Sequence, residues 1–196
     1  MRLCIIVGSN RRNGLSAQVC RLIETHMQGR AACEFVYLSE HDIQYCDADN
    51  KCQNRVCQLT DSVSDIAGSM LRADGIIYMP VMHAYGTNSR FQAFLERVGY
   101  GFFRPLKRPL RDKVAGVVVV GRRYGHTSVY TQIVLNVLLN KMLLIGSGFP
   151  PTFFGMLGKA THDQEAMESL TDMLDRMEEL HHKLEYAKVD ATPMYA

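Results

Sequence analysis

The sequence lacks a strong excess of charge of either sign. Its 22 Lys and Arg residues nearly balance 20 Asp and Glu residues, which leaves a formal net charge of +2. Proteins that bind nucleic acid or an acidic membrane through their overall charge carry a larger positive excess. We therefore expect neither of these partners.

Long apolar runs are also absent. The longest are MLLIG at residues 142–146 and GVVVVG at residues 116–121, far short of the roughly 20 residues that span a bilayer. The apolar stretch near the N-terminus is too brief for a signal peptide, and a glycine-rich turn follows it instead of a cleavage site. We predict a cytoplasmic location and no membrane partner. Internal repeats are missing as well, and residues 1–196 are predicted to form a single domain.

Apolar, β-branched runs alternate with helical patterns along the chain. Strands are predicted at residues 2–7, 33–38, 75–80, 114–120 and 142–145. Helices are predicted at residues 15–27, 62–72, 89–98 and 130–140, and a last helix follows the capping-box pattern Thr161-x-x-Gln164. This alternation is typical of an α/β fold with a doubly wound parallel sheet and helices on both faces. Residues 187–196 are predicted to be a loose tail or a dimer arm.

The turn after the first strand has the composition of a phosphate site. Loop one, GSNRRNGLS at residues 8–16, joins a strand to the start of a helix. Backbone amides, the hydroxyls of Ser9 and Ser16, an arginine and the helix dipole can surround a phosphate there. The loop matches neither G-x-G-x-x-G nor the Walker pattern, which excludes both of those nucleotide-binding motifs.

Two further loops follow strands of the same predicted sheet. Loop two, PVMHAYGTN at residues 80–88, offers an aromatic and a hydroxyl at a strand end. Loop three, GRRYGHT at residues 121–127, offers backbone amides to a polar ring edge. Ligands of doubly wound sheets bind outside the carboxyl ends of the strands. We therefore expect the three loops to form one site for a flat ring that carries a phosphate.

The three loops, in this order, resemble those of the NADPH-dependent FMN reductase group of the flavodoxin-like fold, and within it the iron–sulfur flavoprotein branch. The resemblance covers residues 2–148: GSNRRNGLS is similar to the phosphate loop, PVMHAYGTNSRFQAFLERVG to the second flavin loop, and VGRRYGHTSVYTQIVLNVLLNKMLLIGSG to the third loop and the strand after it. It implies a five-stranded sheet of order 2-1-3-4-5 and a non-covalent FMN.

The resemblance also implies which residues hold the FMN. The phosphate would be held by Ser9, Arg11, Asn13, Leu15 and Ser16. The ring and ribityl chain would be lined by Pro80, Val81, Met82, His83, Ala84, Tyr85 and Thr87, and the pyrimidine edge by Gly121, Arg122, Arg123, Tyr124 and Gly125. Met82 stands where an aromatic residue is common, so Tyr85 or His83 would take the stacking role.

The cysteine loop at residues 46–57 contains three of the six cysteines. Iron–sulfur flavoproteins carry C-x2-C-x2-C and a fourth cysteine at this place, which would correspond to Cys46, Asp49, Cys52 and Cys57. Our favoured interpretation is a loop that has lost its cluster, because a carboxylate suits iron–sulfur iron less well than thiolate. The alternatives are a cluster on the three cysteines with Asp49 as a possible fourth ligand, or a zinc site or disulfide pair.

The function expected from the resemblance is an FMN-dependent NAD(P)H oxidoreductase, with NAD(P)H as co-substrate and a quinone, azo or nitro compound, or flavin as acceptor. Flavin chemistry needs no acid or base from the chain, so no catalytic residue is assigned, and His83 and His126 are taken as spectators. The alternatives are an iron–sulfur electron carrier and a flavin-binding protein without turnover. The resemblance implies a homodimer or homotetramer, with the cysteine loop and residues 97–113 as candidate contacts.

Overall fold

The structure, a computed structural model, describes residues 1–190, with side chains through residue 187. Its centre is a parallel sheet of five strands in the order β2-β1-β3-β6-β8. These strands are β1 (Arg2–Val7), β2 (Ala32–Tyr37), β3 (Gly75–Met79), β6 (Val114–Val117) and β8 (Leu143–Leu144). Numbered among themselves, they have the order 2-1-3-4-5, so the predicted fold class and strand order are confirmed.

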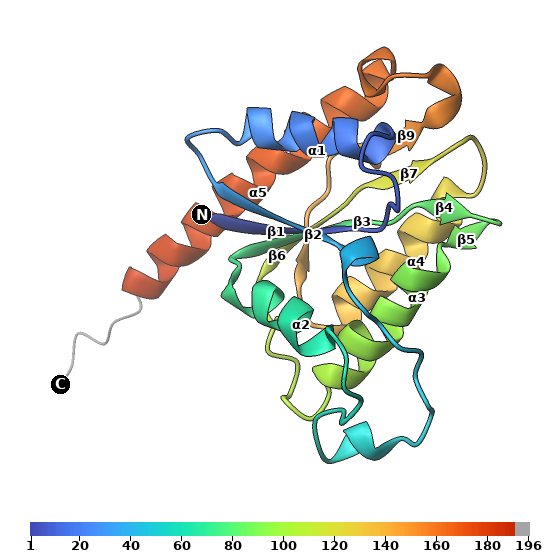
Figure 1. The fold of residues 1–196 in the computed structure, drawn as a ribbon. Helices are drawn as coiled ribbons and strands as arrows, with labels where there is room; N and C mark the ends of the chain where they lie inside the picture. The colour runs from blue at the N-terminus through green and yellow to red at the C-terminus, as the bar shows by residue number, and fades with distance from the viewer. Residues whose placement is uncertain (191–196) are drawn as a thin grey trace.

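Helices cover both faces of this sheet (Figure 1). One face packs against α1 (Leu15–His26) and α5 (Gln164–Asp190), and the other against α2 (Val63–Arg72), α3 (Ser89–Phe94) and α4 (His126–Leu139). The central strands β1, β3 and β6 are almost entirely apolar because both of their faces are buried in this way. Among the described helices, none combines the length and the apolar character that a membrane crossing needs.

The predicted strand at residues 114–120 is two strands. β6 ends at Val117, and Val118, whose N–H donates to Tyr78 O at 2.9 Å, separates it from β7 (Val119–Gly121), which pairs with β9 (Thr152–Phe154) in a small parallel sheet. The four buried valines at residues 117–120 give no sign of this break in the sequence. Short elements complete the fold: β4 (Met82–His83), β5 (Gly86–Thr87), η1 (Leu38–Glu40), η2 (Lys51–Gln53), η4 (Gly155–Leu157) and η5 (Ala160–His162).

Two helices differ from their predicted bounds. The helix that starts at residue 89 continues beyond α3 as a π-helix, η3 (Leu95–Phe102), and α4 begins four residues before the predicted Tyr130. The predicted capping box is wrong. Asp163 caps α5, because its carboxylate accepts the Ala166 N–H at 3.4 Å, and residues 160–162 form η5. The helix continues to residue 190, into the predicted tail, and residues 191–196 lie outside the described part.

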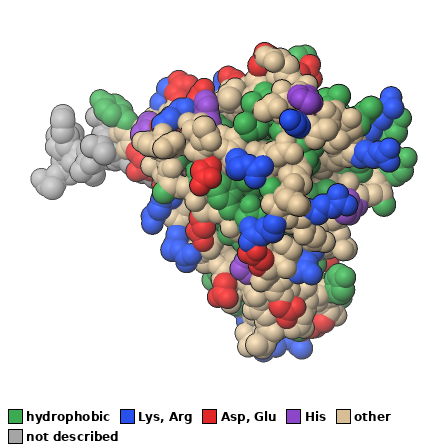
Figure 2. Space-filling view, turned by 45° about the horizontal axis from the view of Figure 1, so that its top comes forward, with side chains coloured by type: hydrophobic (Ala, Val, Ile, Leu, Met, Phe, Trp, Pro, Cys, Tyr) green, Lys and Arg blue, Asp and Glu red, His purple; other side chains and the backbone are tan. Residues whose placement is uncertain are grey.

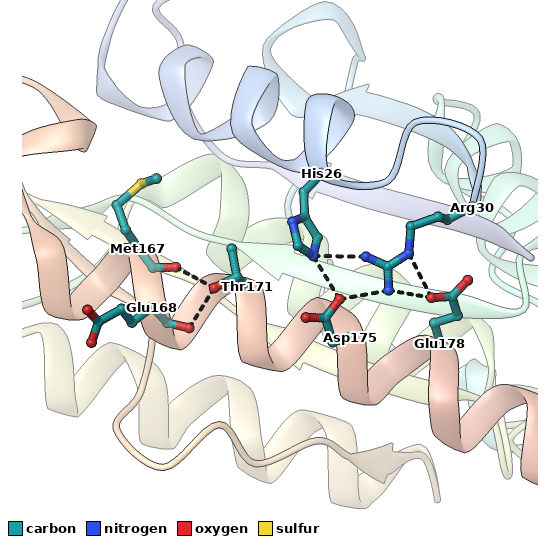
Figure 3. A network of polar contacts seen from close by, with 7 residues as sticks. All are labelled: His26, Arg30, Met167, Glu168, Thr171, Asp175 and Glu178. Carbon is teal, nitrogen blue, oxygen red and sulfur yellow. Dashed lines mark hydrogen bonds and ion pairs between the residues drawn. The ribbon is translucent and has the colours of Figure 1, made fainter.

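A polar network fastens α5 to the end of α1 (Figure 3). Arg30 lies between two acidic side chains of α5, with Nη2 at 2.7 Å from Asp175 Oδ1 and Nε donating to Glu178 Oε2 at 2.8 Å. His26 Nε2 is 2.8 Å from the same Asp175 oxygen. These groups are partly exposed, so each contact stabilises the fold little, and their joint effect is to fix α1 along α5.

The cysteine loop is tied to the body of the protein by a buried ion pair. Arg97 of η3 and Asp61 have side chains only 2% and 1% exposed, and Arg97 Nη1 donates to Asp61 Oδ2 at 2.7 Å. Arg97 Nη1 also donates to Gln44 O at 2.8 Å, and Gln44 N donates to Asp61 Oδ2 at 3.0 Å. The two ends of the segment that carries the cysteines are therefore clamped to η3 by one guanidinium.

Loss of the Asp61 charge is expected to destabilise the fold strongly. Asp61→Asn leaves the Arg97 charge buried without its counterion, which costs about 3–5 kcal/mol of unfolding free energy. Asp112→Asn is the control, because that side chain is 67% exposed, and surface changes stay within about 0.5 kcal/mol. Urea unfolding at pH 7 measures both, and a loss below about 1 kcal/mol for Asp61→Asn, a typical point-mutant value, would contradict the clamp.

The same ion pair makes the stability of the fold depend on pH. Burial raises the pKa of Asp61, but hydrogen bonds from Arg97 and from the amides of Gln44 and Val63 outweigh burial and hold that pKa below its usual value. The stabilisation is therefore complete above the unfolded-state pKa of about 3.9 and is lost as pH falls through the lowered folded-state pKa. The difference between wild type and Asp61→Asn should shrink in that acid range.

Candidate functional site

Loops one and two meet at the carboxyl ends of β1 and β3. The Gly8 N–H donates to Met79 O at 2.9 Å, and Asn88 Nδ2 donates to Gly8 O at 2.9 Å. A Cβ on Gly8 would lie 2.7 Å from Phe91 Cδ2 and 3.0 Å from Asn88 Oδ1, so only glycine fits there. Asn88 Oδ1 is buried and has no hydrogen-bond partner among the described residues, which leaves an acceptor between the two loops.

Loop one presents donors and positive charge at the start of α1. Ser9 is nearly buried and its Oγ accepts the Arg11 N–H at 3.1 Å, while Ser16 is buried in the first helical turn. That turn contains no acidic residue, so the helix dipole is not neutralised there. Arg12 is engaged by an ion pair with Glu40 and by the Tyr37 ring, 3.5 Å from its guanidinium carbon. Arg11 is exposed and forms no ion pair with the described side chains.

Loop two is a tight hairpin. Met82 pairs with Thr87 and His83 with Gly86, which leaves Ala84 and Tyr85 as a two-residue turn. Both turn residues have positive φ, 47° and 65°, the backbone that a type I′ hairpin requires. Neither residue favours that region, and strained turns of this kind cluster at ligand sites. The turn carries Tyr85 outward, 71% exposed.

Loop three lies against this hairpin. A Cβ on Gly121 would be 2.9 Å from Met82 Cβ, and one on Gly125 would be 3.1 Å from Tyr85 Cα, so two glycines permit the close approach. Val120 N donates to Pro80 O at 3.2 Å and adds a backbone link between the loops. Basic and apolar side chains gather at one edge of the molecule (right in Figure 2), the side on which the β4–β5 hairpin projects in Figure 1.

His126, the first residue of α4, is buried beneath loop three. Its Nε2 lies 3.2 Å from Phe153 O, and its ring lies 4.4 Å from the Phe154 ring. Burial lowers the pKa of His126 despite its hydrogen bonds to the backbone of Phe153 and Gly121. The imidazole is therefore neutral near pH 7 and joins β9 to loop three.

The structure brings the three loops together at one sheet edge, and it adds two residues that were not among the predicted flavin contacts. Asn88, the last residue of loop two, is the first, because its amide donates to Gly8 O and does not cap α3. Gly155 is the second addition, because a Cβ there would lie 3.3 Å from Gly121 O and 3.7 Å from Leu15 Cδ2. It comes from a segment more than 25 residues beyond loop three, so local pattern gives no sign of it.

The cysteine loop does not gather its predicted metal ligands. Among the described residues, no three His, Cys, Asp or Glu side chains are placed to hold a metal ion. Cys46 Sγ accepts the Ala48 N–H at 3.4 Å, and Asp49 accepts the Lys51 N–H and pairs with Lys51 Nζ, both at 2.9 Å. In this arrangement the residues fit neither an iron–sulfur cluster nor zinc, so no step of a mechanism is derived through a metal.

Glycine at position 121 is expected to be required for the packing of loops two and three. Gly121→Ala places a methyl group against Met82 and His126, and such overpacking costs about 1–3 kcal/mol. Gly146→Ala is the matched control, because its Cβ meets nothing within 4 Å. Thermal unfolding compares the two variants, and equal melting temperatures would contradict the described contact.

The comparisons with known proteins agree with this geometry. Residues 1–152 match the family NADPH-dependent FMN reductase. No curated protein matches the chain. Similar solved structures include the NAD(P)H:acceptor flavoenzyme FerB from Paracoccus denitrificans (12% identity, TM-score 0.68, 93% of this chain and 97% of that one). RosB with bound 8-demethyl-8-formylriboflavin-5'-phosphate is another (14% identity, TM-score 0.70, 100% of this chain and 90% of that one). A third is the apo form of the NADH:FMN oxidoreductase EMOB (15% identity, TM-score 0.64, 90% of this chain and 88% of that one).

At these identities the solved structures show a shared fold. The family match covers more than half of the chain and includes all three loops. The chain belongs to the NADPH-dependent FMN reductase family, and it is an oxidoreductase with a flavodoxin-like fold.

Proposed function

We propose that the protein binds FMN at loops one to three and transfers hydride from NAD(P)H to a small acceptor. The observation that carries the proposal is the start of α1, where Ser9, Arg11 and Ser16 meet a helical turn without acidic residues. An anion with several acceptor oxygens fits such a place. The strained hairpin and the glycine-lined loop three adjoin it, as a ring linked to that phosphate requires.

The phosphate end is held by backbone and side chains of loop one. The Ser9 and Ser16 hydroxyls and the free amides of the first turn of α1 donate to phosphate oxygens. Arg11 supplies the charge, because Arg12 is already engaged by Glu40 and Tyr37. The other proposed phosphate contacts are Asn13 and Leu15. Asn88 Oδ1, buried and unpartnered among the described residues, is suited to accept from a ribityl hydroxyl nearby.

The ring end is held by loops two and three. Pro80, Val81, Met82, His83, Ala84, Tyr85 and Thr87 line the ring and the ribityl chain, and residues 121–125 donate to the pyrimidine edge. FMN held there would supply the hydride-accepting ring chemistry. The chain orients the two rings and excludes water from between them. No proton transfer from a side chain is required, which agrees with the neutral, buried His126.

The acceptor is proposed to be a quinone, an azo or nitro compound, or free flavin, because the site needs only a flat molecule that can replace the nicotinamide. Arg122 and Arg123 are exposed beside the site, and we assign them to the nicotinamide nucleotide's phosphate groups. The cytoplasm, which supplies reduced nicotinamide, is the proposed location. An electron carrier that relays through a cluster gains no support, because the cluster ligands are not gathered.

Arg11 is expected to set the affinity for the phosphate of FMN. Arg11→Ala removes a hydrogen bond to a charged group, worth about 1.5–3 kcal/mol, so the dissociation constant for FMN should rise by roughly ten- to a hundredfold. Riboflavin, which lacks the phosphate, should bind both proteins equally. Arg12→Ala is the control, because its guanidinium contacts Glu40 and Tyr37. Fluorescence titration measures the affinities of all three proteins for both ligands. Equal losses for FMN and riboflavin would contradict the assignment.

We further propose a homodimer or homotetramer formed through α4. Leu135 and Leu138 are 62% and 56% exposed, and Leu139 is 39% exposed. A helix that is apolar on its outer as well as its inner face is normally buried on both. A groove of about 290 Å³, lined in part by Leu95, Tyr100 and Leu139, runs beside it, and such a surface can pair with its own copy about a two-fold axis. The cysteine loop and residues 97–113 stay candidate contacts, although the Arg97 side chain itself is buried against Asp61 within the subunit.

Charge on this face is expected to separate the subunits. The double variant Leu135→Glu, Leu138→Glu places two carboxylates on each partner, so the mass in solution should fall to that of one chain. Leu71→Glu is the control, because Leu71 is an exposed leucine of α2, far along the chain from α4. Analytical ultracentrifugation with circular dichroism tests both, and a folded double variant that keeps the wild-type mass would contradict the α4 interface.

A further inference from the structure

A groove of about 350 Å³ lies between α1 and the segment that follows β9, and we call it the α1 groove. Arg21 and Thr25 belong to its α1 wall, and Lys159 and Thr161 to the opposite wall, which lies beside α1 in Figure 1 (orange). The volume is that of a pocket for a small molecule or part of one. The groove shares no lining residue with loops one to three, so the proposed FMN contacts do not account for it.

The charged side chains of the α1 groove are both cationic. Arg21 comes from one wall and Lys159 from the other, and both residues are exposed. Neither side chain forms an ion pair with the described part of the chain, and none of the residues that line the groove is acidic. Two unpaired cations in a groove without a carboxylate attract an anion.

The neutral side chains of the groove supply hydrogen-bond donors. Gln18 Oε1 accepts the Ala160 N–H at 3.0 Å, which joins the two walls and leaves Gln18 Nε2 as an accessible donor. The hydroxyls of Thr25 and Thr161 add two more. A phosphate monoester has three terminal oxygens that accept such bonds, one more than a carboxylate. Charge and donors together therefore favour a phosphate group.

The segment after β9 joins this groove to the proposed flavin site. β9 ends at Phe154, which pairs with Gly121 of loop three, and η4 follows at the same edge of the sheet. The Met156 N–H donates to Arg122 O at 3.1 Å, which holds η4 against loop three. From Met156 to Lys159 the chain covers at most about 11 Å. An extended dinucleotide with its nicotinamide at the flavin ring can therefore reach the groove.

The side chains along this path follow the order of the parts of such a dinucleotide. Arg122 and Arg123 of loop three are exposed at its start. Met156 and Leu157 come next, 51% and 43% exposed, and Lys159 of the groove follows. Cations, an apolar surface and a further cation match a pyrophosphate, an adenosine and a second phosphate in that order.

We propose that the α1 groove binds the 2′-phosphate of NADPH, with Arg21 and Lys159 as its counter-charges and the adenosine laid across Met156 and Leu157. The proposal rests on the proposed function, because it requires the nicotinamide at the flavin ring. NADH lacks the 2′-phosphate and leaves both cations unengaged. The groove therefore makes NADPH the preferred nucleotide, and its residues take no part in hydride transfer.

Steady-state kinetics of the FMN-loaded, full-length protein test the preference, with NADPH and NADH compared at one fixed quinone concentration. Wild type should have the higher kcat/KM for NADPH. The double variant Arg21→Ala, Lys159→Ala should lower that preference about tenfold, the effect of roughly 1.4 kcal/mol, through KM for NADPH. The double variant Lys51→Ala, Arg55→Ala is the matched control, because it removes the same charge from the cysteine loop. Equal losses for the two nucleotides would overturn the proposal.

A binding measurement tests the groove apart from turnover. By calorimetry, 2′,5′-ADP should bind wild type at least about tenfold more tightly than 5′-AMP, and Arg21→Ala should remove most of that difference. This result in a protein that oxidises neither nucleotide would support the groove and contradict the proposed function. Equal affinities for the two probes would overturn the groove even if NADH and NADPH are oxidised. Inorganic phosphate that competes as well as 2′,5′-ADP would also overturn it, because the groove would then be a site for free phosphate.

Discussion

Parallel pairing of β3 with both β1 and β6 sets the position of every loop in the proposed flavin site. The register places Val7 opposite Met79 and Tyr78 opposite Val117, so the strands end at one edge of the sheet. The connecting helices cover the faces, and only the loops remain at that edge. Contacts between those loops then fix their positions relative to one another. Asn88 links loops one and two, and Met82 links loops two and three through the glycines beside it.

Backbone strain marks the same edge. Ala84 and Tyr85 both adopt positive φ in a turn for which Asn-Gly is the usual sequence. The surrounding contacts hold this turn, since Gly125 lies directly against the Tyr85 backbone. A turn of Asn-Gly would carry less strain but would leave the hairpin without the aromatic side chain at its tip. Strained turns of this kind cluster at ligand sites, which agrees with the proposed place of this hairpin at the flavin site.

Much of the fold was predictable because burial on both faces forces the strands to be apolar and the helices between them to be amphipathic. The sheet order and the position of the three loops follow from that pattern and from the family resemblance. The break at Val118 was not predictable, because β7 pairs with β9, a segment far along the chain, and the valines on either side are alike. The cap at Asp163 was missed because Thr161 offers the same chemistry two residues earlier.

The cysteine loop shows the limit of spacing as an argument. Cys46, Asp49, Cys52 and Cys57 have the intervals of a ligand set, yet Asp49 pairs with Lys51 and Cys46 accepts the Ala48 N–H. Sequence intervals fix how far apart two side chains can be along the chain. They do not fix which way each side chain points, and here contacts within the loop turn Cys46 and Asp49 to their own neighbours.

α3 and η3 form one continuous helix that runs from loop one to the cysteine loop. Asn88 precedes α3 and faces loop one, and Tyr100 of the continuous η3 lines a cavity of about 470 Å³ beside the cysteine loop. At 1.5 Å per residue, the stretch from Asn88 to Tyr100 spans roughly 18 Å. Tyr100 therefore has no direct contact with loop one. The second half of this helix is a π-helix, a form found often at functional sites.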